Sequence, residues 1–377
     1  MNRSTTGRIS TGVLMLFGLT ALTLTACAGG PAKPISRTEL LLGTTITMTV
    51  YDRVNSAVLD RAFARVRDIH NRMTTEGTES EVDKINQEAG IRPVPVTPDV
   101  YGVIKTSLDF SRLTNGAFDI TVGPIVKLWG IGTDHERLPS PDEIKALLPL
   151  VNWRWIKLND SDNSVYLEKK GMGIDLGGIA KGYAADEAER ILAEGGVKHA
   201  ILDFGGNILV LGSKPDGANW RIGIQTPFQT RGSFLGIVST ADMSVVTSGP
   251  YERYFIKNGT MYHHIIDPKT GYPVQQHLTS TTIYSGVSMI CDGLSTSIFV
   301  MGLDKGAALI RMLKGVDAIF VTDDNKVYYT DGLEGKFEIT NTEYKRAAFP
   351  TAVPSGEYWP PDPAAVTAIE KLDRVNP

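Results

Sequence analysis

The feature that most restricts the fold of this chain is the way its β-type segments follow one another in runs. Alternating stretches rich in Thr, Val and Ile predict strands at 44–51, 164–169, 199–211, 220–226, 235–240, 244–247 and 279–285, with a closing hairpin at 318–322 and 327–330. Apolar residues at helical spacing predict helices at 56–73, 100–113, 139–148 and 179–194, and a further helix that begins at Asp292. Grouped strands of this kind are typical of α+β folds, so we predict one large domain of mixed, mainly antiparallel sheets with flanking helices.

The N-terminus has the pattern of a bacterial export signal. Two arginines precede about a dozen apolar residues, which are too few to span a membrane comfortably. Leu24-Thr25-Ala26-Cys27 then forms a lipobox. We therefore predict a signal peptide at 1–26, a lipid on the sulfur of Cys27, and a linker at 27–37. The alternative is a plain signal peptide that is cut nearby, with Cys27 incidental.

Composition and charge argue against nucleic-acid binding and against a fold held by disulfides. The formal net charge of −4 comes without the basic stripe that a nucleic-acid-binding protein needs. Cys291 is the one cysteine besides Cys27, so a lipidated chain has no intramolecular disulfide and depends on its core. Residues 346–377 are rich in proline, and we expect a loosely packed C-terminal extension with a short helix near 364–372.

Two glycine-rich segments have the composition of ligand-binding loops. Residues 116–124 (GAFDITVGP) combine glycines, a proline and a ring, which bring backbone groups close to a flat ligand; a tight turn around a satisfied Asp119 is the alternative. Residues 173–182 (GIDLGGIAKG) lead from a strand through paired glycines into a helix, whose first N–H groups favour a phosphate. Lys181 adds positive charge there, although neither standard phosphate-loop spacing is present. The alternative is a tight turn between strand and helix, with Lys181 on the surface.

Two further segments combine histidines or hard oxygen ligands with turns. His263 and His264 precede a strong turn signature at 267–271, and a histidine at a strand end can act as a base or contact a cofactor. Incidental histidines beside a structural turn are the alternative. In residues 291–297 (CDGLSTS), Asp292 is expected to cap a helix, with two hydroxyl residues three and four positions later on the same side. Three such oxygens suit Mg²⁺, whereas a simple cap uses only the first.

In their order along the chain, these segments resemble the ApbE family of flavin transferases. The motifs that carry the resemblance are AFDITVGP, IDLGGIAKG, DFGGN at 203–207, TSG at 247–249, HIIDPKTG at 264–271 and DGLST at 292–296. The resemblance covers roughly residues 38 to 330. It implies a T-fold-type flavin transferase domain, which we place at 38–345, and it fits an exported lipoprotein.

The resemblance also implies the residues of the site. FAD would be the substrate, and its expected contacts are Leu42, Ala117, Phe118, Asp119, Asp175, Lys181, His264 and Ile265. Mg²⁺ would lie between the carbonyl of Gly178 and the side chains of Asp292 and Thr296, with Ser295 as a further candidate. FMN would pass to a Thr or Ser hydroxyl of a target protein through a phosphoester bond, and AMP would leave. His264 ranks before Asp292 as the base, because an aspartate tied to a metal is a poor base.

The implied partner is an acceptor protein with a D-x-(S/T)-G-A-(S/T) motif, such as a membrane-bound redox subunit. The lipid would hold the enzyme on a bacterial membrane, facing the periplasm or the cell exterior. Two alternatives use the same features: a metal-dependent FAD pyrophosphatase that gives FMN and AMP, and a non-catalytic flavin-binding lipoprotein. Family members often carry an aromatic residue shortly after the first helix, where this chain has Met73-Thr74-Thr75-Glu76-Gly77.

Overall fold

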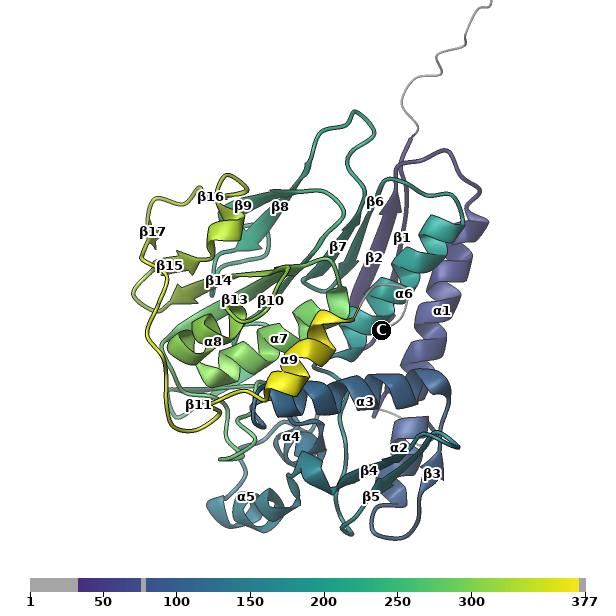
Figure 1. The fold of residues 1–377 in the computed structure, drawn as a ribbon, viewed down its shortest axis with the longest axis vertical. Coiled ribbons are helices and arrows are strands. Elements are labelled where there is room, and N and C mark those ends of the chain that lie inside the picture. The colour runs from purple at the N-terminus through teal and green to yellow at the C-terminus, as the bar shows by residue number, and fades with distance from the viewer. Residues whose placement is uncertain (1–32, 76–78, 373–377) are drawn as a thin grey trace, which may run out of the picture. The chain divides into compact units, whose positions relative to one another are not determined.

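A nine-stranded sheet forms the centre of the fold (Figure 1). In spatial order its strands are β1 (Ile35–Leu41), β2 (Thr44–Val50), β6 (Ala200–Phe204), β7 (Asn207–Leu211), β10 (Ser244–Ser248), β13 (Leu278–Ser285), β14 (Val316–Thr322), β15 (Lys326–Tyr329) and β17 (Lys345–Arg346). All neighbouring pairs are antiparallel except β15 and β17, which are parallel. The predicted α+β class with mainly antiparallel pairing is therefore confirmed.

This computed structural model describes residues 33–75 and 79–372. The predicted signal peptide, Cys27 and the first part of the expected linker lie outside these residues. β1 begins at Ile35, so the last three residues of the expected linker belong to the sheet. Within the described ranges, no helix is long and apolar enough to cross a membrane.

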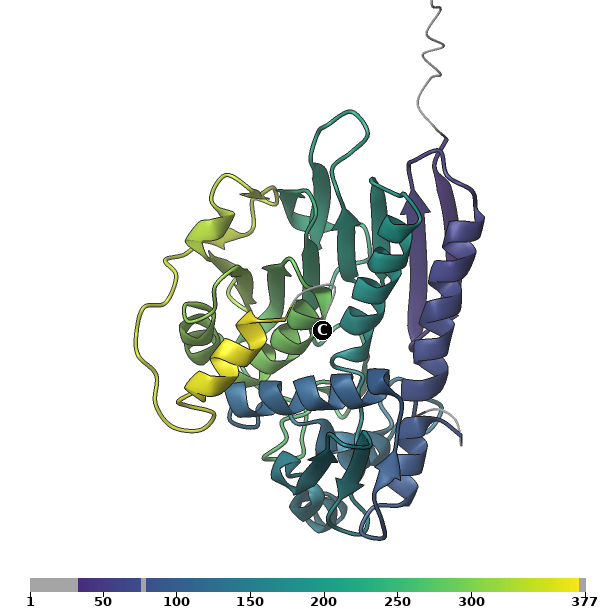
Figure 2. The ribbon, with the colours of Figure 1, turned by 45° about the vertical axis from the view of Figure 1, so that its right-hand side comes forward.

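Helices cover one face of the large sheet, and a second sheet covers the other. The helices are α1 (Ala57–Met73), α6 (Ala180–Glu194), α7 (Ser288–Met301) and α8 (Leu303–Ile310). α6 lies between α1 and α7, as both views show (Figures 1 and 2), and α7 rests on β10 and β13. On the opposite face, β8 (Trp220–Gln225), β9 (Phe234–Thr240) and β16 (Phe337–Ile339) form a three-stranded sheet, whose Trp220 and Leu235 belong to one apolar cluster with Val245 and Ile319.

The remaining elements lie around α3 (Pro98–Leu113), which crosses the ends of α1 and α6 in the lower half of Figure 1. They are α2 (Glu81–Gln87), β3 (Val94–Pro95), α4 (Gly123–Trp129), α5 (Pro141–Leu147), β4 (Ile156–Asn159), β5 (Ser164–Leu167), the hairpin of β11 (Tyr254–Lys257) and β12 (Thr260–His263), and α9 (Pro363–Glu370). Short 3-10 turns occur at Ile120–Val122, Leu148–Leu150, Trp153–Trp155 and Asp331–Leu333. Ser140 caps the start of α5 and forms a full capping box with Glu143.

The segment expected as a single strand at 199–211 is two strands. Gly205 and Gly206 have φ angles of +68° and +95°, so they form the turn between β6 and β7. A Cβ on Gly205 would lie 2.0 Å from Thr44 Oγ1, which explains why this turn has no side chain at that point. The turn brings Asn207 to the beginning of β7.

The helix expected to begin at Asp292 begins one turn earlier, at Ser288, so the predicted cap is wrong. The buried carboxylate of Asp186, on α6, accepts hydrogen bonds from the N–H groups of Ser288 and Met289, both at 2.8 Å. A carboxylate that accepts these bonds satisfies the free N–H groups of a helix start and complements its dipole. Because Asp186 performs this role, Asp292 lies inside the helix and its side chain reaches a cavity.

The C-terminal extension packs more closely than its proline content indicates. Tyr358, Ala365 and Ile369 are buried and belong to the main core, and α9 packs against α3. The short helix that the sequence predicts is present as α9. The expectation of loose packing is therefore wrong for this part of the extension.

Candidate functional site

A cavity of about 630 Å³ lies where the glycine-rich loops meet the ends of the large sheet. This volume is in the range of small-molecule and cofactor sites. The expected FAD contacts all line it: Leu42, Ala117, Phe118, Asp119, Asp175, Lys181, His264 and Ile265. Gly178, Asp292 and Thr296 line it as well, whereas Ser295 does not.

Backbone contacts hold two of the glycine-rich loops against each other. The N–H of Asp175 donates to the carbonyl of Ile120 (2.8 Å), and a Cβ on Gly123 would lie 2.8 Å from the carbonyl oxygen of Gly173. The Asp175 carboxylate accepts a hydrogen bond from Gly177 N (2.7 Å), which fixes the turn before α6. The two loops therefore form one wall of the cavity.

Lys181 and Asp292 form an ion pair at the end of this wall. The ammonium nitrogen of Lys181 lies 3.1 and 3.3 Å from the two carboxylate oxygens of Asp292, and it donates to the carbonyl of Gly177 at 2.9 Å. Asp292 is almost fully buried and also accepts a bond from Gly182 N (2.9 Å). A positive group thus already lies between a carboxylate and a backbone carbonyl, both of which are hard oxygen donors.

Gly178 and Thr296 lie beside this pair. A Cβ on Gly178 would be 3.8 Å from Thr296 Oγ1 and 3.2 Å from the Phe118 ring, so the loop and α7 meet at this point. Ser295 is fully buried: its hydroxyl donates to the Asp292 carbonyl (3.0 Å) and accepts from Ser248 Oγ (2.8 Å). The structure therefore brings Gly178, Asp292 and Thr296 together and turns Ser295 away.

Asp119 has a structural role within its loop. Its carboxylate accepts hydrogen bonds from Thr121 N, Thr121 Oγ1 and Trp153 N, at 2.9, 2.6 and 3.0 Å. Burial raises the pKa of Asp119 to about 6, and these hydrogen bonds and Arg154 act in the opposite direction. The neighbouring Phe118 ring is buried and packs 5.6 Å from the ring of Phe110.

His264 presents a neutral imidazole to the cavity. Enclosure by the protein lowers the pKa of His264 to about 3, and the positive charge of Arg253 acts in the same direction. In the neutral ring, Nδ1 donates to the carbonyl of Arg253 (3.2 Å), so Nε2 keeps its lone pair. The imidazole can therefore accept a proton at Nε2.

Several lining residues were not identified from the sequence. His70, from the last turn of α1, accepts a hydrogen bond from Leu42 N (3.3 Å) at Nδ1, and Leu42 has a φ of +52° in the β1–β2 turn. Arg253 lines the cavity and donates to the Gly43 carbonyl (3.3 Å). The TSG motif at 247–249, which belongs to the family resemblance but was given no role in the site, also lines the cavity. The alternation of β1 could have indicated a hairpin here, but nothing local links it to His70.

Asn207 is a further cavity residue, from the DFGGN motif. It is 1% exposed, and its Oδ1 accepts a hydrogen bond from Ser288 Oγ (2.7 Å). Among the residues that the structure describes, Nδ2 has no hydrogen-bond partner. A buried amide donor without a partner is unfavourable, so this group is suited to an acceptor atom of a ligand.

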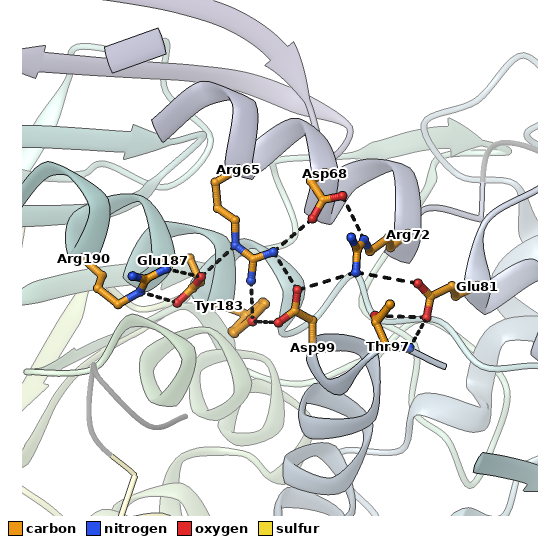
Figure 3. A network of polar contacts seen from close by, with 9 residues as sticks. All are labelled: Arg65, Asp68, Arg72, Glu81, Thr97, Asp99, Tyr183, Glu187 and Arg190. Atoms are coloured by element: carbon orange, nitrogen blue, oxygen red, sulfur yellow. Dashed lines mark hydrogen bonds and ion pairs between the residues drawn. The ribbon is translucent and has the colours of Figure 1, made fainter. Parts of the chain in front are cut away.

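A polar network outside the cavity fixes the helix that carries Lys181 (Figure 3). Arg65, on α1, donates to Glu187 (2.7 Å) and Tyr183 (3.0 Å) on α6 and to Asp99 on α3 (2.6 Å). Tyr183 also donates to Asp99 (2.9 Å). These charge-assisted bonds lower the pKa of Asp99 despite its burial, and they connect three helices near the start of α6.

Fold and site together define a protein with a nucleotide-sized cavity, where a glycine-rich turn and a helix start face a carboxylate. Comparison with known proteins identifies the class. The chain matches the ApbE family over residues 42–320 and belongs to this family.

Relatives with assigned activities match most of the chain. It is 34% identical over 337 residues to an FAD:protein FMN transferase of Treponema pallidum, which covers 85% of this chain and 93% of the relative. It is 35% identical over 310 residues to an FAD:protein FMN transferase of Klebsiella pneumoniae, which covers 82% and 96%. The ApbE protein of Thermotoga maritima has a similar structure, with a TM-score of 0.74, 30% identity and coverage of 81% and 99%. The flavin transferase ApbE of Vibrio cholerae gives a TM-score of 0.72 with 26% identity, and coverage of 81% and 100%.

Proposed function

We propose that this enzyme is an FAD:protein FMN transferase, which moves FMN from FAD to a Thr or Ser hydroxyl of an acceptor protein and releases AMP. The observation that carries the proposal is that one cavity is lined by all the residues expected to contact FAD and by all those expected to hold a cation except Ser295. Relatives that cover most of the chain carry this activity in their names. In the cavity, Lys181 and the N-terminus of α6 are suited to the pyrophosphate.

We further propose that Asp292, Thr296 and the Gly178 carbonyl hold Mg²⁺. Carboxylate, hydroxyl and carbonyl oxygens are the ligands that this ion takes, and the Lys181 ammonium shows that positive charge is accommodated beside Asp292. The part of the chain that the structure describes has no cluster of three His, Cys, Asp or Glu side chains suited to a metal, so this site would depend on hydroxyl and backbone oxygens. When bound, the ion would neutralise charge on the phosphate oxygens.

In the proposed reaction, individual residues of the cavity have separate roles. The hydroxyl oxygen of the acceptor attacks the phosphorus of the FMN half, the bond between this phosphorus and the bridging oxygen breaks, and AMP leaves with that oxygen. Nε2 of His264 takes the hydroxyl proton. Burial and Arg253 lower the pKa of this ring, and the negative charge of a bound pyrophosphate would act in the opposite direction. With Asp292 as a metal ligand, Lys181 would lose this partner and would be available for a phosphate of FAD.

The remaining parts of the proposal concern location and partner. Lipidation of Cys27 would hold the enzyme on a membrane, facing the periplasm or the cell exterior, close to a membrane-bound acceptor with a D-x-(S/T)-G-A-(S/T) motif. A Cys27→Ser variant tests this part separately. It should lose incorporation of labelled palmitate and leave the membrane fraction, whereas a Cys291→Ser variant should retain both.

A single incubation tests the reaction. The domain from residue 33 onward is mixed with FAD, Mg²⁺ and an acceptor that carries the target motif, and products are followed by mass spectrometry and by AMP release. Transfer predicts an FMN adduct on the acceptor and one AMP for each adduct. An acceptor whose target hydroxyl is replaced by alanine is the control and should stay unmodified.

The other outcomes separate the alternatives. AMP and free FMN without an adduct would show that water is the acceptor, as in a pyrophosphatase. FAD that remains bound and intact in the presence of Mg²⁺ and acceptor would identify a flavin-binding protein without turnover. Either result would reject the transferase.

A further inference from the structure

We propose that Tyr358 is a positioning residue for the cavity: it holds the turn at Asp267–Gly271, and through this turn His264 and Ile265, from the C-terminal segment of the chain. The proposal uses the proposed function only in taking the cavity as the FAD site. Tyr358 lies beyond the residues that match the family, 42–320. The contacts of its side chain supply the argument.

Residues 347–372, here called the C-terminal strap, are anchored at both ends. At the beginning, Ala347 N donates to the carbonyl of Val327 on β15 (2.9 Å), and Arg311 donates to the carbonyl of Ala352 (3.1 Å). At the end, α9 packs on α3, and Glu370 accepts a bond from Lys314 N (3.0 Å). Figure 1 shows this segment running from β17 around the molecule to α9. The middle of the strap is thus held between two fixed points.

Tyr358 makes the contact between the strap and the turn. Its side chain is 3% exposed, and its hydroxyl donates to Oδ1 of Asp267. The ammonium of Lys269 lies 4.1 Å from the centre of its ring, and Glu357 lies 3.9 Å from the same ammonium. Two charged residues of the turn therefore have their partners on the strap.

The backbone of Tyr358 supports this interpretation. Its φ angle is +62°, a region that L-residues with large side chains rarely adopt. Such a conformation costs free energy and persists only where surrounding contacts hold it. The contacts with Asp267 and Lys269 are the interactions that orient this side chain.

The turn at Asp267–Gly271 is connected directly to the cavity wall. The Asp267 carbonyl accepts a bond from Gly271 N (2.8 Å), and the Gly271 carbonyl accepts one from the Trp129 indole (2.9 Å). On the cavity side, Val274 N donates to the Ile265 carbonyl (3.0 Å). A loosened turn would therefore release Ile265 and the adjoining His264, both of which line the cavity.

The test compares Tyr358→Phe with a matched control. Tyr358→Phe removes the hydroxyl and keeps the ring over which Lys269 lies. Tyr101→Phe removes the same group from a tyrosine that is also buried and donates to an aspartate, but this aspartate is Asp160 (2.9 Å), which lies outside the turn at Asp267–Gly271. Both full-length variants are measured by hydrogen exchange, by FAD affinity from flavin fluorescence, and by kcat and KM for FAD.

We expect amide exchange at residues 264–271 to rise roughly tenfold in Tyr358→Phe relative to exchange in β13, because the lost bond has a charged acceptor. The Kd and the KM for FAD should rise roughly threefold to tenfold, with a smaller change in kcat. Tyr101→Phe should leave FAD affinity and exchange at 264–271 within about twofold of wild type.

Two other outcomes overturn the proposal. Equal acceleration at 264–271 and in β13 would mean that Tyr358 contributes only to global stability. Unchanged exchange and unchanged FAD affinity would mean that the turn holds its place without Tyr358. If the wild-type protein does not bind FAD, the proposed function fails, and the exchange ratio still decides whether Tyr358 positions the turn.

Discussion

The close approach of α6 and α7 at Gly182 offers the sharpest test of how the site is built. A Cβ on Gly182 would lie 2.5 Å from the Ser288 carbonyl oxygen, 2.6 Å from Met289 Cα and 2.8 Å from Asp292 Cβ. Ordinary carbon contacts are about 3.5–4.0 Å. Two of the three atoms belong to the backbone, so a Gly182→Ala variant can relieve the overlap only if the helices separate by about 1 Å.

The expected loss of stability follows from two opposing effects. Overpacking of this kind costs about 1–3 kcal/mol, while Ala in a helix interior gains about 1 kcal/mol over Gly. Because the obstructing atoms are mainly backbone, we expect a net loss of about 2 kcal/mol, seen as a fall in Tm of a few °C. Separation of the helices also weakens the bond from Gly182 N to Asp292. A misplacement of about 1 Å at a reacting centre costs about a hundredfold in rate, so we expect a loss of that order in kcat.

Thermal unfolding followed by circular dichroism measures the first effect, and AMP release in the presence of FAD, Mg²⁺ and the acceptor measures the second. Gly102→Ala in α3 is the matched control, because apart from the neighbouring backbone of α3 itself no atom lies within 4 Å of the Cβ it introduces. This control should be stabilised by about 1 kcal/mol and keep wild-type turnover. If Gly182→Ala were as stable and as active as wild type, the close helix contact would not be what positions Asp292.

Three further predictions concern single side chains. Asn207→Asp keeps the oxygen that accepts the bond from Ser288 but replaces the unpartnered Nδ2 donor with an oxygen. The Kd for FAD, measured by fluorescence titration, should rise about tenfold or more, and an unchanged Kd would exclude a contact between Asn207 and FAD. Asp292→Ala should abolish Mg²⁺-dependent AMP release, and Mg²⁺-dependent turnover at the wild-type rate would remove Asp292 from the metal site. Burial raises the pKa of Asp119 from 3.8 to about 6, so as the pH rises the unfolded state releases this proton at a lower pH than the folded state does. The free energy of unfolding should therefore be highest below about pH 4 and should fall by at most about 3 kcal/mol as the pH rises through 6. Urea denaturation between pH 4 and 7.5 should give a flatter profile for Asp119→Asn, and parallel profiles would contradict the pKa shift.

Local sequence patterns were sufficient for most of the elements near the site. The spacing of apolar residues predicted α1, α3 and α6, and the paired glycines before α6 predicted the turn that precedes it. These features depend on interactions within a few residues, so they are encoded locally. Very short strands have too few residues for a pattern, and β11 and β17, with four and two residues, were not predicted for this reason. β1 has seven residues that alternate in burial, but its first residues were assigned to the linker.

The beginning of α7 shows why the roles of some site residues could not be predicted from local sequence patterns. Asp292 had the local sequence of a cap, but Asp186, located 102 residues before Ser288, caps this helix instead. The sheet brings the two together, and the result changes the role of Asp292 from a cap to a cavity residue. The same applies to Ser295, whose spacing matched that of Thr296 but whose hydroxyl is held by Ser248.

The sequence by itself determined the fold class, the family resemblance and the order of the motifs, because these are properties of short segments and their succession. Only the tertiary structure decided which of those side chains share a cavity, which hydroxyl faces it, and that the C-terminal strap closes on the turn behind His264. The physical reason is that a cavity is made of atoms from distant segments, and the hydrogen bonds that orient them form only when the sheet and helices have packed.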